Sequence, residues 1–167
     1  HDKEALIAEM QQCIKPTYLG GVEVPHDLNH ITMGTLIKLQ NIDKAQAYDL
    51  APVIVLDVKP EALEKEPCED VIGFSNWVAL ELRRLADLFA SCRTDLLPEQ
   101  EQAGFGNLNF GMFGVLDWYC RRMGITDHAE VEQVPWVRVY KCMDMDAQTR
   151  RCEQRLSEIQ SNKLKRR

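Results

Sequence analysis

The chain has 167 residues, of which 45% are hydrophobic and 28% are charged, and its net charge is −6. This composition is typical of a soluble globular protein with a real core, and it excludes a mostly disordered chain. The longest apolar run, residues 51–56, is far shorter than the roughly 20 residues that span a bilayer, and the first residues lack the positive charge of a signal peptide, so we expect a cytoplasmic protein.

The chain begins with a predicted helix and a predicted hairpin. Residues 2–14 carry apolar side chains on one side and stop before Pro16, which is the pattern of a short amphipathic helix. In residues 17–24, Gly20 and Gly21 lie between two short β-prone runs. A Gly-Gly pair in that position favours a two-residue hairpin, because both turn residues can take positive φ without strain.

Two short helices and one ambiguous segment follow the hairpin. Thr32 is a good N-cap for a helix over residues 33–42, and Asp43 can cap a second helix that reaches Leu50. The apolar residues 53–58 fit either a buried strand or a buried helix, and periodicity alone does not separate the two. We favour the helix, because the segments around it are helical.

The middle of the chain predicts long helices separated by a loop. Residues 71–92 form the longest apolar face of the sequence at helical spacing. Residues 93–103 have the composition of a loop, and a second helix is expected over 108–123, closed by Gly124 in a left-handed C-cap. Thr126 or Asp127 can then cap a short helix. Together these elements predict an all-α fold, a compact multi-helix bundle with a small N-terminal β-hairpin and an amphipathic, basic C-terminal helix.

The last two predicted helices, residues 136–145 and 147–167, differ sharply in charge. Residues 147–167, which we call the tail, carry seven Lys/Arg and two Asp/Glu. The net charge therefore divides into −11 for residues 1–146 and +5 for the tail. We expect an acidic helical domain over residues 1–146 and a basic C-terminal helix over residues 147–167, packed on that domain or on a partner.

The tail supplies the candidate partner-binding residues. Cys152, Leu156, Ile159 and the pair Lys163/Leu164 recur at steps of four, three and four, the spacing of one helix face. The apolar contact would come from Leu156, Ile159 and Leu164. Attraction and salt sensitivity would come from the cations of the tail, which are Arg150, Arg151, Arg155, Lys163, Lys165, Arg166 and Arg167.

No set of residues predicts catalysis, a cofactor or a metal site. His26 and His30 flank Asp27 at a spacing of four, but they follow Pro25 in a predicted turn, where that spacing does not place both rings on one helix face. The carboxylates of residues 61–70 have the pattern of a solvated face. We therefore predict a non-enzymatic protein without a cofactor, a metal or a small-molecule substrate, although spacing alone does not exclude an active site assembled in space.

The six cysteines form no CxxC pair, which argues against a zinc ribbon or a redox motif. Four of them lie beside apolar residues in predicted helices, namely Cys92, Cys120, Cys142 and Cys152. Free cysteine behaves as a small apolar residue in such surroundings. We expect reduced thiols packed in the core.

Residues 104–114 have the most unusual local composition, with four glycines and three phenylalanines. The segment lacks the Gly-Lys-Ser/Thr end of a phosphate-binding loop, so nucleotide binding is not expected. We favour a close helix contact, in which Gly111 and Gly114 let another backbone approach while the phenylalanines fill the gaps. A conformational joint or an exposed aromatic patch for a partner is the alternative.

Residues 24–42 begin with a short β segment and a proline and continue into a helix start of the form Ile-Thr-x-Gly-x-Leu, with matches at Ile31, Thr32, Gly34, Leu36, Leu39 and Ile42. This layout resembles the opening of small helical proteins encoded among the structural genes of tailed phages. Some of those proteins are regarded as tail assembly chaperones, which are helical and non-enzymatic and hold tail components soluble until the tail polymerises. The resemblance implies an assembly role and assigns no functional residue.

Taken together, these features predict a non-enzymatic protein-binding or assembly protein of the phage tail assembly chaperone or adaptor type. It would bind another protein or a second copy of itself, in the host cytoplasm or within a virion, without contacting a membrane. One alternative is a virion ring or connector subunit, in which the acidic body of one copy receives the basic tail of the next. A further alternative is a weak nucleic-acid accessory protein that places the tail on phosphates, although the acidic body disfavours nucleic acid as a partner.

Overall fold

The computed structural model describes residues 2–165 and is mostly helical, with one two-stranded antiparallel sheet. The all-α expectation is therefore confirmed. The helices are α1 (Asp2–Gln12), α2 (Met33–Gln40), α3 (Ala47–Leu56), α4 (Pro60–Leu63), α5 (Cys68–Ser91), α6 (Pro98–Gln102), α7 (Gly111–Met123), α8 (His128–Glu132) and α9 (Trp136–Lys165), the 3-10 turns are η1 (Lys44–Gln46) and η2 (Phe105–Asn107), and the strands are β1 (Tyr18–Leu19) and β2 (Val22–Glu23).

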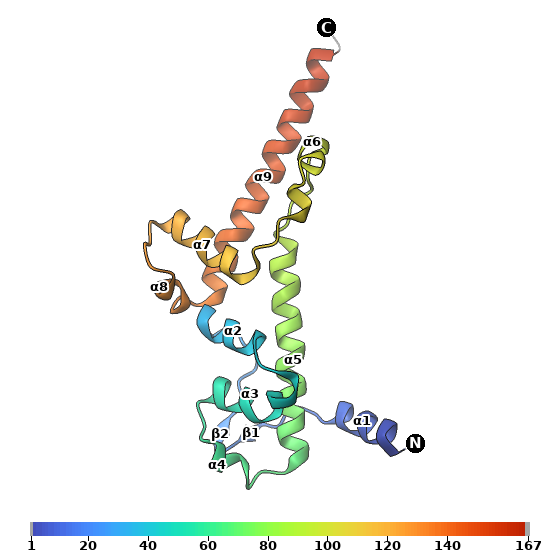
Figure 1. Cartoon of the computed structure of the whole chain (residues 1–167), viewed down its shortest axis with the longest axis vertical. Coiled ribbons are helices and arrows are strands. Elements are labelled where there is room, and N and C mark those ends of the chain that lie inside the picture. The colour runs from blue at the N-terminus through green and yellow to red at the C-terminus, as the bar shows by residue number, and fades with distance from the viewer. Residues whose placement is uncertain (1, 166–167) are drawn as a thin grey trace.

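The molecule is elongated, with the two longest helices as its framework (Figure 1). Helices α5 and α9 run in the same direction and overlap along part of their lengths, and the end of α9 projects beyond the rest of the chain. The hairpin, α2, α3 and α4 surround the lower part of α5, whereas α7 and α8 lie beside the start of α9. Within the described part of the chain, no helix is both long enough and apolar enough to cross a bilayer.

The predicted hairpin is present and its turn has the expected backbone. Gly20 and Gly21 have φ values of 59° and 77°, and the strands pair Leu19 with Val22 in antiparallel register. Leu19 is fully buried in the core, and the Gly20 N–H donates to Glu66 Oε1 at 3.0 Å. The hairpin is therefore fixed to the helices around it, since two paired residues in each strand give little stability by themselves.

Side-chain caps begin the short helices as the sequence predicts. The Thr32 hydroxyl accepts a hydrogen bond from the Thr35 N–H at 3.2 Å, and Asp43 caps the turn η1 that leads into α3. The ambiguous residues 53–58 belong to a helix as far as Leu56. Pro52 lies in the interior of this helix, so the carbonyl four residues earlier lacks its usual helical donor.

The core joins the segment before α2 to the segment before α9. The Met33 N–H donates to the Val134 carbonyl at 2.9 Å, and the Trp136 N–H donates to the Ile31 carbonyl at 3.2 Å. The buried Trp136 ring also donates from Nε1 to the Leu28 carbonyl at 2.7 Å. These bonds connect positions about a hundred residues apart in sequence and fix the base of α9 to the body.

An ion pair on α5 supports the same junction. Glu81 Oε2 accepts from the Leu28 N–H at 2.9 Å and from Arg84 Nη2 at 2.7 Å. Arg84 also donates to Asn29 Oδ1 at 2.8 Å and lies over the Trp136 ring. The hydrogen bond from Arg84 is the largest effect on the Glu81 carboxyl and lowers its pKa, although partial burial opposes the shift.

Three predicted boundaries in the second half of the chain differ from the structure. Residues 93–103 contain the short helix α6, and the helix expected over 108–123 begins only at Gly111, where the Asn109 side chain accepts from the Gly111 N–H. The helices expected over 136–145 and 147–167 are one helix, α9, because no glycine or proline lies between Trp136 and Lys165 to end it. The division into residues 1–146 and 147–167 stays a prediction, although the helix crosses that boundary without a break.

Candidate partner-binding surface

The first half of the tail is anchored to the end of α5. Arg151 Nη2 donates to the carbonyl of Ser91, the last residue of α5, and at 3.1 Å to the carbonyl of Arg93. One turn later, Gln154 Nε2 donates to the Asp95 carbonyl at 3.2 Å. A cation at a helix C-terminus satisfies carbonyls that have no helical partner and is favoured by the helix dipole. Arg151 thus supports the fold, and its role in binding a partner stays a prediction.

The predicted apolar stripe of the tail is exposed. Leu156 is 54% exposed, Ile159 is 52% exposed and Leu164 is 73% exposed. Cys152 is also exposed, which corrects its assignment as a core thiol. In contrast, Ala147 is fully buried against the body. Large apolar side chains gathered on one exposed helix face are typical of a protein-binding surface.

The stripe and the anchored side of α9 point in different directions. Successive residues of an α-helix are about 100° apart around its axis. On that geometry Cys152, Leu156 and Ile159 lie in one sector, whereas Ala147, Arg151 and Gln154 lie in another roughly 140° away. The stripe is therefore turned away from the body, and packing of the rest of the chain does not explain it.

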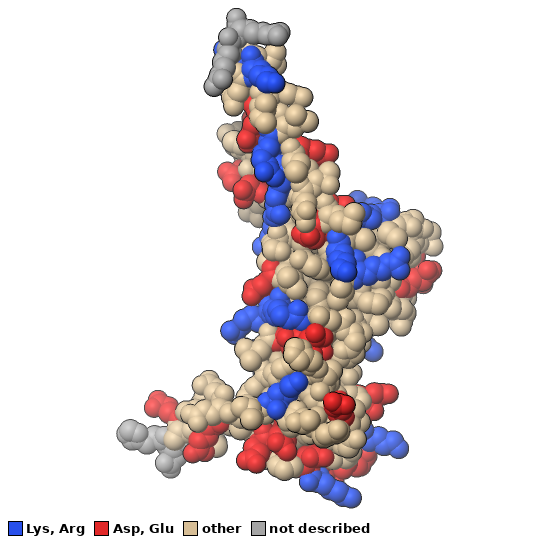
Figure 2. Space-filling view, turned by 180° about the vertical axis from the view of Figure 1, so that it is seen from behind, with Lys and Arg blue, Asp and Glu red and all other residues tan. Residues whose placement is uncertain are grey.

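The other predicted cations of the tail are exposed where the structure describes them, and Arg155 and Lys163 lie nearest the stripe. Arg150, Arg155, Lys163 and Lys165 are exposed, and Arg166 and Arg167 lie outside the described residues. Figure 2 shows Lys and Arg side chains along the projecting end of the molecule. The hydrogen bonds that Arg150 and Arg155 make are to their own helix, from Arg150 Nε to the Asp146 carbonyl and from Arg155 Nε to the Arg151 carbonyl. Their charges remain available to an acidic partner.

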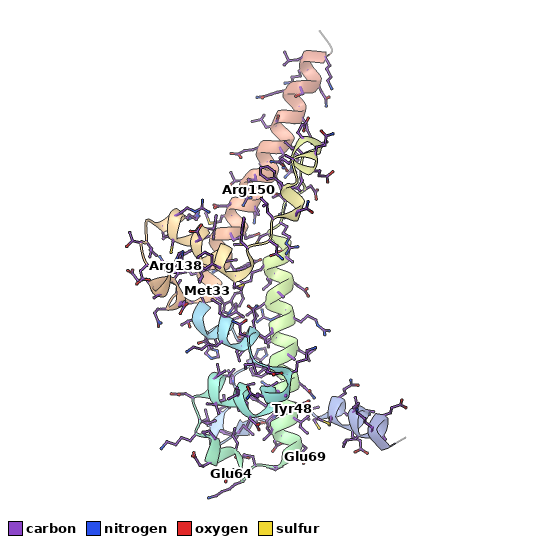
Figure 3. All side chains as sticks on the ribbon, in the orientation of Figure 1. Met33, Tyr48, Glu64, Glu69, Arg138 and Arg150 are labelled. Atoms are coloured by element: carbon purple, nitrogen blue, oxygen red, sulfur yellow. The ribbon has the colours of Figure 1, made fainter. Side chains whose placement is uncertain are left out.

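A second exposed surface, the aromatic cleft, was not located by the sequence. It has a volume of about 560 Å³ and lies between α5, α7 and α9, where Phe89, Phe110, Val115, Trp118 and Met143 contribute apolar surface. Arg93 and Arg150 are among the residues that line it, and Figure 3 labels Arg150 about midway along α9. The apolar lining with a few cations suits a protein side chain or a short helix.

Residues 104–114, which are rich in glycine and phenylalanine, contribute to this cleft rather than to a close helix contact. A Cβ on Gly111 would meet nothing within 4 Å, and a Cβ on Gly114 would meet only the Phe110 side chain. Phe105, Phe110 and Phe113 are between 51% and 67% exposed. The expected close approach of another backbone is therefore wrong, and the exposed aromatic patch that the composition also allowed is present.

The histidine candidates do not form a site. The His26 side chain is 99% exposed, and Asp27 instead accepts from the Asn29 N–H at 2.9 Å, as in a polar turn. In α8, His128 Nε2 lies 3.6 Å from Asp117 Oδ1, and Asp117 also pairs with Arg121 at 2.9 Å. Among residues 2–165, no group of three His, Cys, Asp or Glu side chains is placed to hold a metal.

The cysteines are free thiols with different exposures. Cys92 and Cys120 are buried, Cys142 is half-buried, and Cys68 and Cys152 are exposed. Burial is the main effect that raises the pKa of the Cys92 thiol, with the Asp144 charge adding to it. A thiol with a raised pKa is a weak nucleophile, so Cys92 has the properties of a structural residue.

Comparison of this chain with known protein families, with curated proteins and with solved structures finds no match.

Proposed function

We propose that this chain is a non-enzymatic assembly or adaptor protein, of the kind that tail assembly chaperones represent, and that it binds a protein partner through the projecting half of α9. One observation carries the proposal. Leu156, Ile159 and Leu164 are more than half exposed, and they belong to residues 155–165 of α9, all of which are exposed. Exposure of this much apolar surface has no structural benefit for an isolated chain, whereas a partner would remove it from water.

The charge of the tail suits an acidic partner surface. The cations beside the stripe would lie at the rim of the contact, where charges raise the association rate and select the partner more than they add affinity. The stripe would supply most of the affinity. We therefore expect binding that weakens at high salt without being lost.

The test is co-expression of the chain with the proteins encoded beside its gene, followed by affinity capture and measurement of stoichiometry. We expect a stoichiometric complex with one of them, and the double substitution Leu156→Asp with Ile159→Asp should abolish it. Ser157→Asp with Ser161→Asp is the matched control, since it adds the same charge to exposed positions of the same helix outside the sector of Cys152, Leu156 and Ile159. Circular dichroism should show that both variants keep the helical content of the wild type.

A complex that survives Leu156→Asp with Ile159→Asp would contradict the proposal. So would a variant whose body melts, because the stripe would then be part of the core.

A ring or connector subunit is a second candidate, and one observation favours it. Glu9, Glu69 and Asp70 line a hollow between α1 and the start of α5, next to Ile14, which is 82% exposed. Figure 2 shows acidic side chains gathered around this end of the molecule, opposite to the basic end of α9. Contact between the tail of one copy and this hollow of the next would form a ring or filament. Light scattering should then show oligomers that high salt disperses.

A further inference from the structure

The predicted stripe can be extended along the exposed side of α9 toward the body. Met145, which is 60% exposed, and the exposed Thr149 continue it toward the body. The face then runs through positions 145, 149, 152, 156, 159 and 163, at alternating steps of four and three. We call these six positions the seam. Alternation of four and three is the a/d spacing of a coiled coil, with Thr149, Leu156 and Lys163 at a and Met145, Cys152 and Ile159 at d.

We propose that the seam pairs with the seam of a second copy of this chain to form a parallel two-stranded coiled coil. The inference rests on the proposed function, which leaves the protein partner unspecified, and it names that partner. A seven-residue repeat packs fully only against a helix with the same repeat. The same helix in a second copy provides that repeat in register.

The position of the body leaves room for the second helix. The seam lies roughly 140° around α9 from the side that Ala147, Arg151 and Gln154 hold against the body. Two copies related by a two-fold axis along the seam would therefore keep their bodies on opposite, outer sides of the paired helices. Residues at the outer positions, including Arg150 and Arg151, would stay on the outside, so that much of the tail's positive charge would not oppose the pairing.

The residues that flank the seam favour the parallel direction. In a parallel pair, Arg155 at position g faces Gln160 at position e of the second copy, and Gln148 faces Glu153. Neither pair brings like charges together. In the antiparallel arrangement that keeps all six layers, Arg155 faces Arg155 of the second copy and Glu153 faces Glu153. These like-charge pairs would destabilise the antiparallel arrangement.

The composition of the seam predicts a weak dimer. Only Met145, Leu156 and Ile159 are large apolar residues, and Lys163 faces itself in the last layer, where a lone a-position lysine reduces stability but fixes the register. The seam also spans fewer than the three to four heptads that define a strong coiled coil. We expect a dissociation constant in the micromolar range or above, with monomers at high dilution.

Cys152 provides a test of direction, because a parallel pair places the two Cys152 thiols in the same central layer. Sedimentation over a range of protein concentrations should show a monomer–dimer equilibrium for the wild type and for Ser157→Asp with Ser161→Asp. Leu156→Asp with Ile159→Asp should weaken dimerisation by about a hundredfold or more, since it replaces two apolar layers with repelling charges. Mild oxidation with diamide should give a cross-linked dimer that Cys152→Ser abolishes and Cys68→Ser retains.

Three outcomes would overturn the inference. A wild-type chain that stays monomeric at the highest concentration would rule out the dimer. The proposed function would still be supported if the chain binds a neighbouring gene product and the Leu156→Asp with Ile159→Asp variant does not. A dimer without the Cys152 cross-link would exclude the parallel seam. Oligomers that high salt disperses, and that Glu69→Gln with Asp70→Asn prevents, would show instead that the tail binds the hollow beside α1.

Discussion

At the scale of single residues, the surroundings of Gly73 leave no space for a side chain, and no sequence motif indicates this. A Cβ on this buried residue of α5 would overlap the backbone carbonyl of Ile14, where the chain leaves α1 and crosses α5. The Asn76 side chain secures the same crossing by donating to the Met10 carbonyl at 2.8 Å. The place where α1 leaves the body thus depends on the absence of one side chain.

We therefore expect Gly73→Ala to lower the free energy of unfolding by about 1–3 kcal/mol, because a rigid backbone must shift to admit the methyl group. The gain in helix propensity on replacing glycine with alanine offsets only about 1 kcal/mol of that cost. Urea denaturation measures the change. Gly106→Ala is the control, since its Cβ would make only an ordinary contact with Leu96, and an equal effect of both substitutions would contradict the argument.

Glu81 is a second residue whose contribution to stability depends on the partners that the fold places around it. Its carboxylate joins Leu28 and Arg84, and its pKa is lowered by the hydrogen bond from Arg84. A lowered folded-state pKa stabilises the protein at every pH above the unfolded-state value near 4.5. That contribution is lost as the pH falls through the folded-state pKa. Part of the acid sensitivity of this protein should therefore come from Glu81.

Glu81→Gln should lower the free energy of unfolding at neutral pH by about 1–3 kcal/mol, because a charged hydrogen bond is replaced by a neutral one. The difference from the wild type should shrink below pH 4.5 as the wild-type carboxyl takes up a proton. Denaturation at several pH values measures both effects. The exposed Glu64 provides the control substitution, Glu64→Gln, and a difference for Glu81→Gln that does not depend on pH would contradict this account.

At the scale of secondary-structure elements, α9 has two functions along one unbroken helix. Its first half packs in the core through Trp136, Val139 and Ala147. Its second half is held only at the base, where Arg151 and Gln154 contact the end of α5 and the residues after it. The stiffness of a continuous helix then holds the exposed stripe away from the body without further contacts.

Arg151→Ala should loosen this base. We expect faster hydrogen exchange in the last turn of α5 and in residues 150–160, because the carbonyls of Ser91 and Arg93 lose their donor. Arg155→Ala is the matched control, since the side-chain bonds of Arg155 stay within α9. Similar exchange rates in both variants would show that Arg151 does not anchor the helix.

At the scale of the whole molecule, the structure divides the tail between the body and solvent. Residues up to Gln154 contact other elements, whereas residues 155–165 are exposed. The boundary between packed and projecting chain therefore falls inside the tail, about two turns after the change in charge that suggested residues 1–146 as one domain.

A chain that ends at Arg155 should accordingly unfold with nearly the same free energy as the full chain, within about 0.5 kcal/mol, at protein concentrations where both are monomeric. A chain that ends at Asp146 should lose about 1–3 kcal/mol, because it lacks Ala147 and the hydrogen bonds of Arg151 and Gln154. Denaturation of the two truncated chains beside the full chain tests this. Equal losses in both would mean that residues 156–165 stabilise the body.

The candidate site was predictable to the extent that it is local. The positions of Leu156, Ile159 and Leu164 on one helix face follow from the helical repeat, so the sequence located the exposed stripe. The sequence did not show that Arg151 donates a hydrogen bond to the end of α5, because this bond depends on where α5 ends relative to α9. The aromatic cleft was missed for the same reason, since its lining comes from three helices and only the composition of residues 104–114 indicated it.

Elements that depend on a few neighbouring residues were predictable from the amino-acid sequence. Gly20 and Gly21 set the hairpin, Thr32 and Asp127 cap their helices, and Gly124 ends α7 with a φ of 68°. In contrast, the three-dimensional fold was needed to show which segments meet and which face of each helix is covered. Pairing of the segment at Ile31 with that at Trp136 is an example, because such contacts join residues far apart in the chain and local patterns carry no information about them.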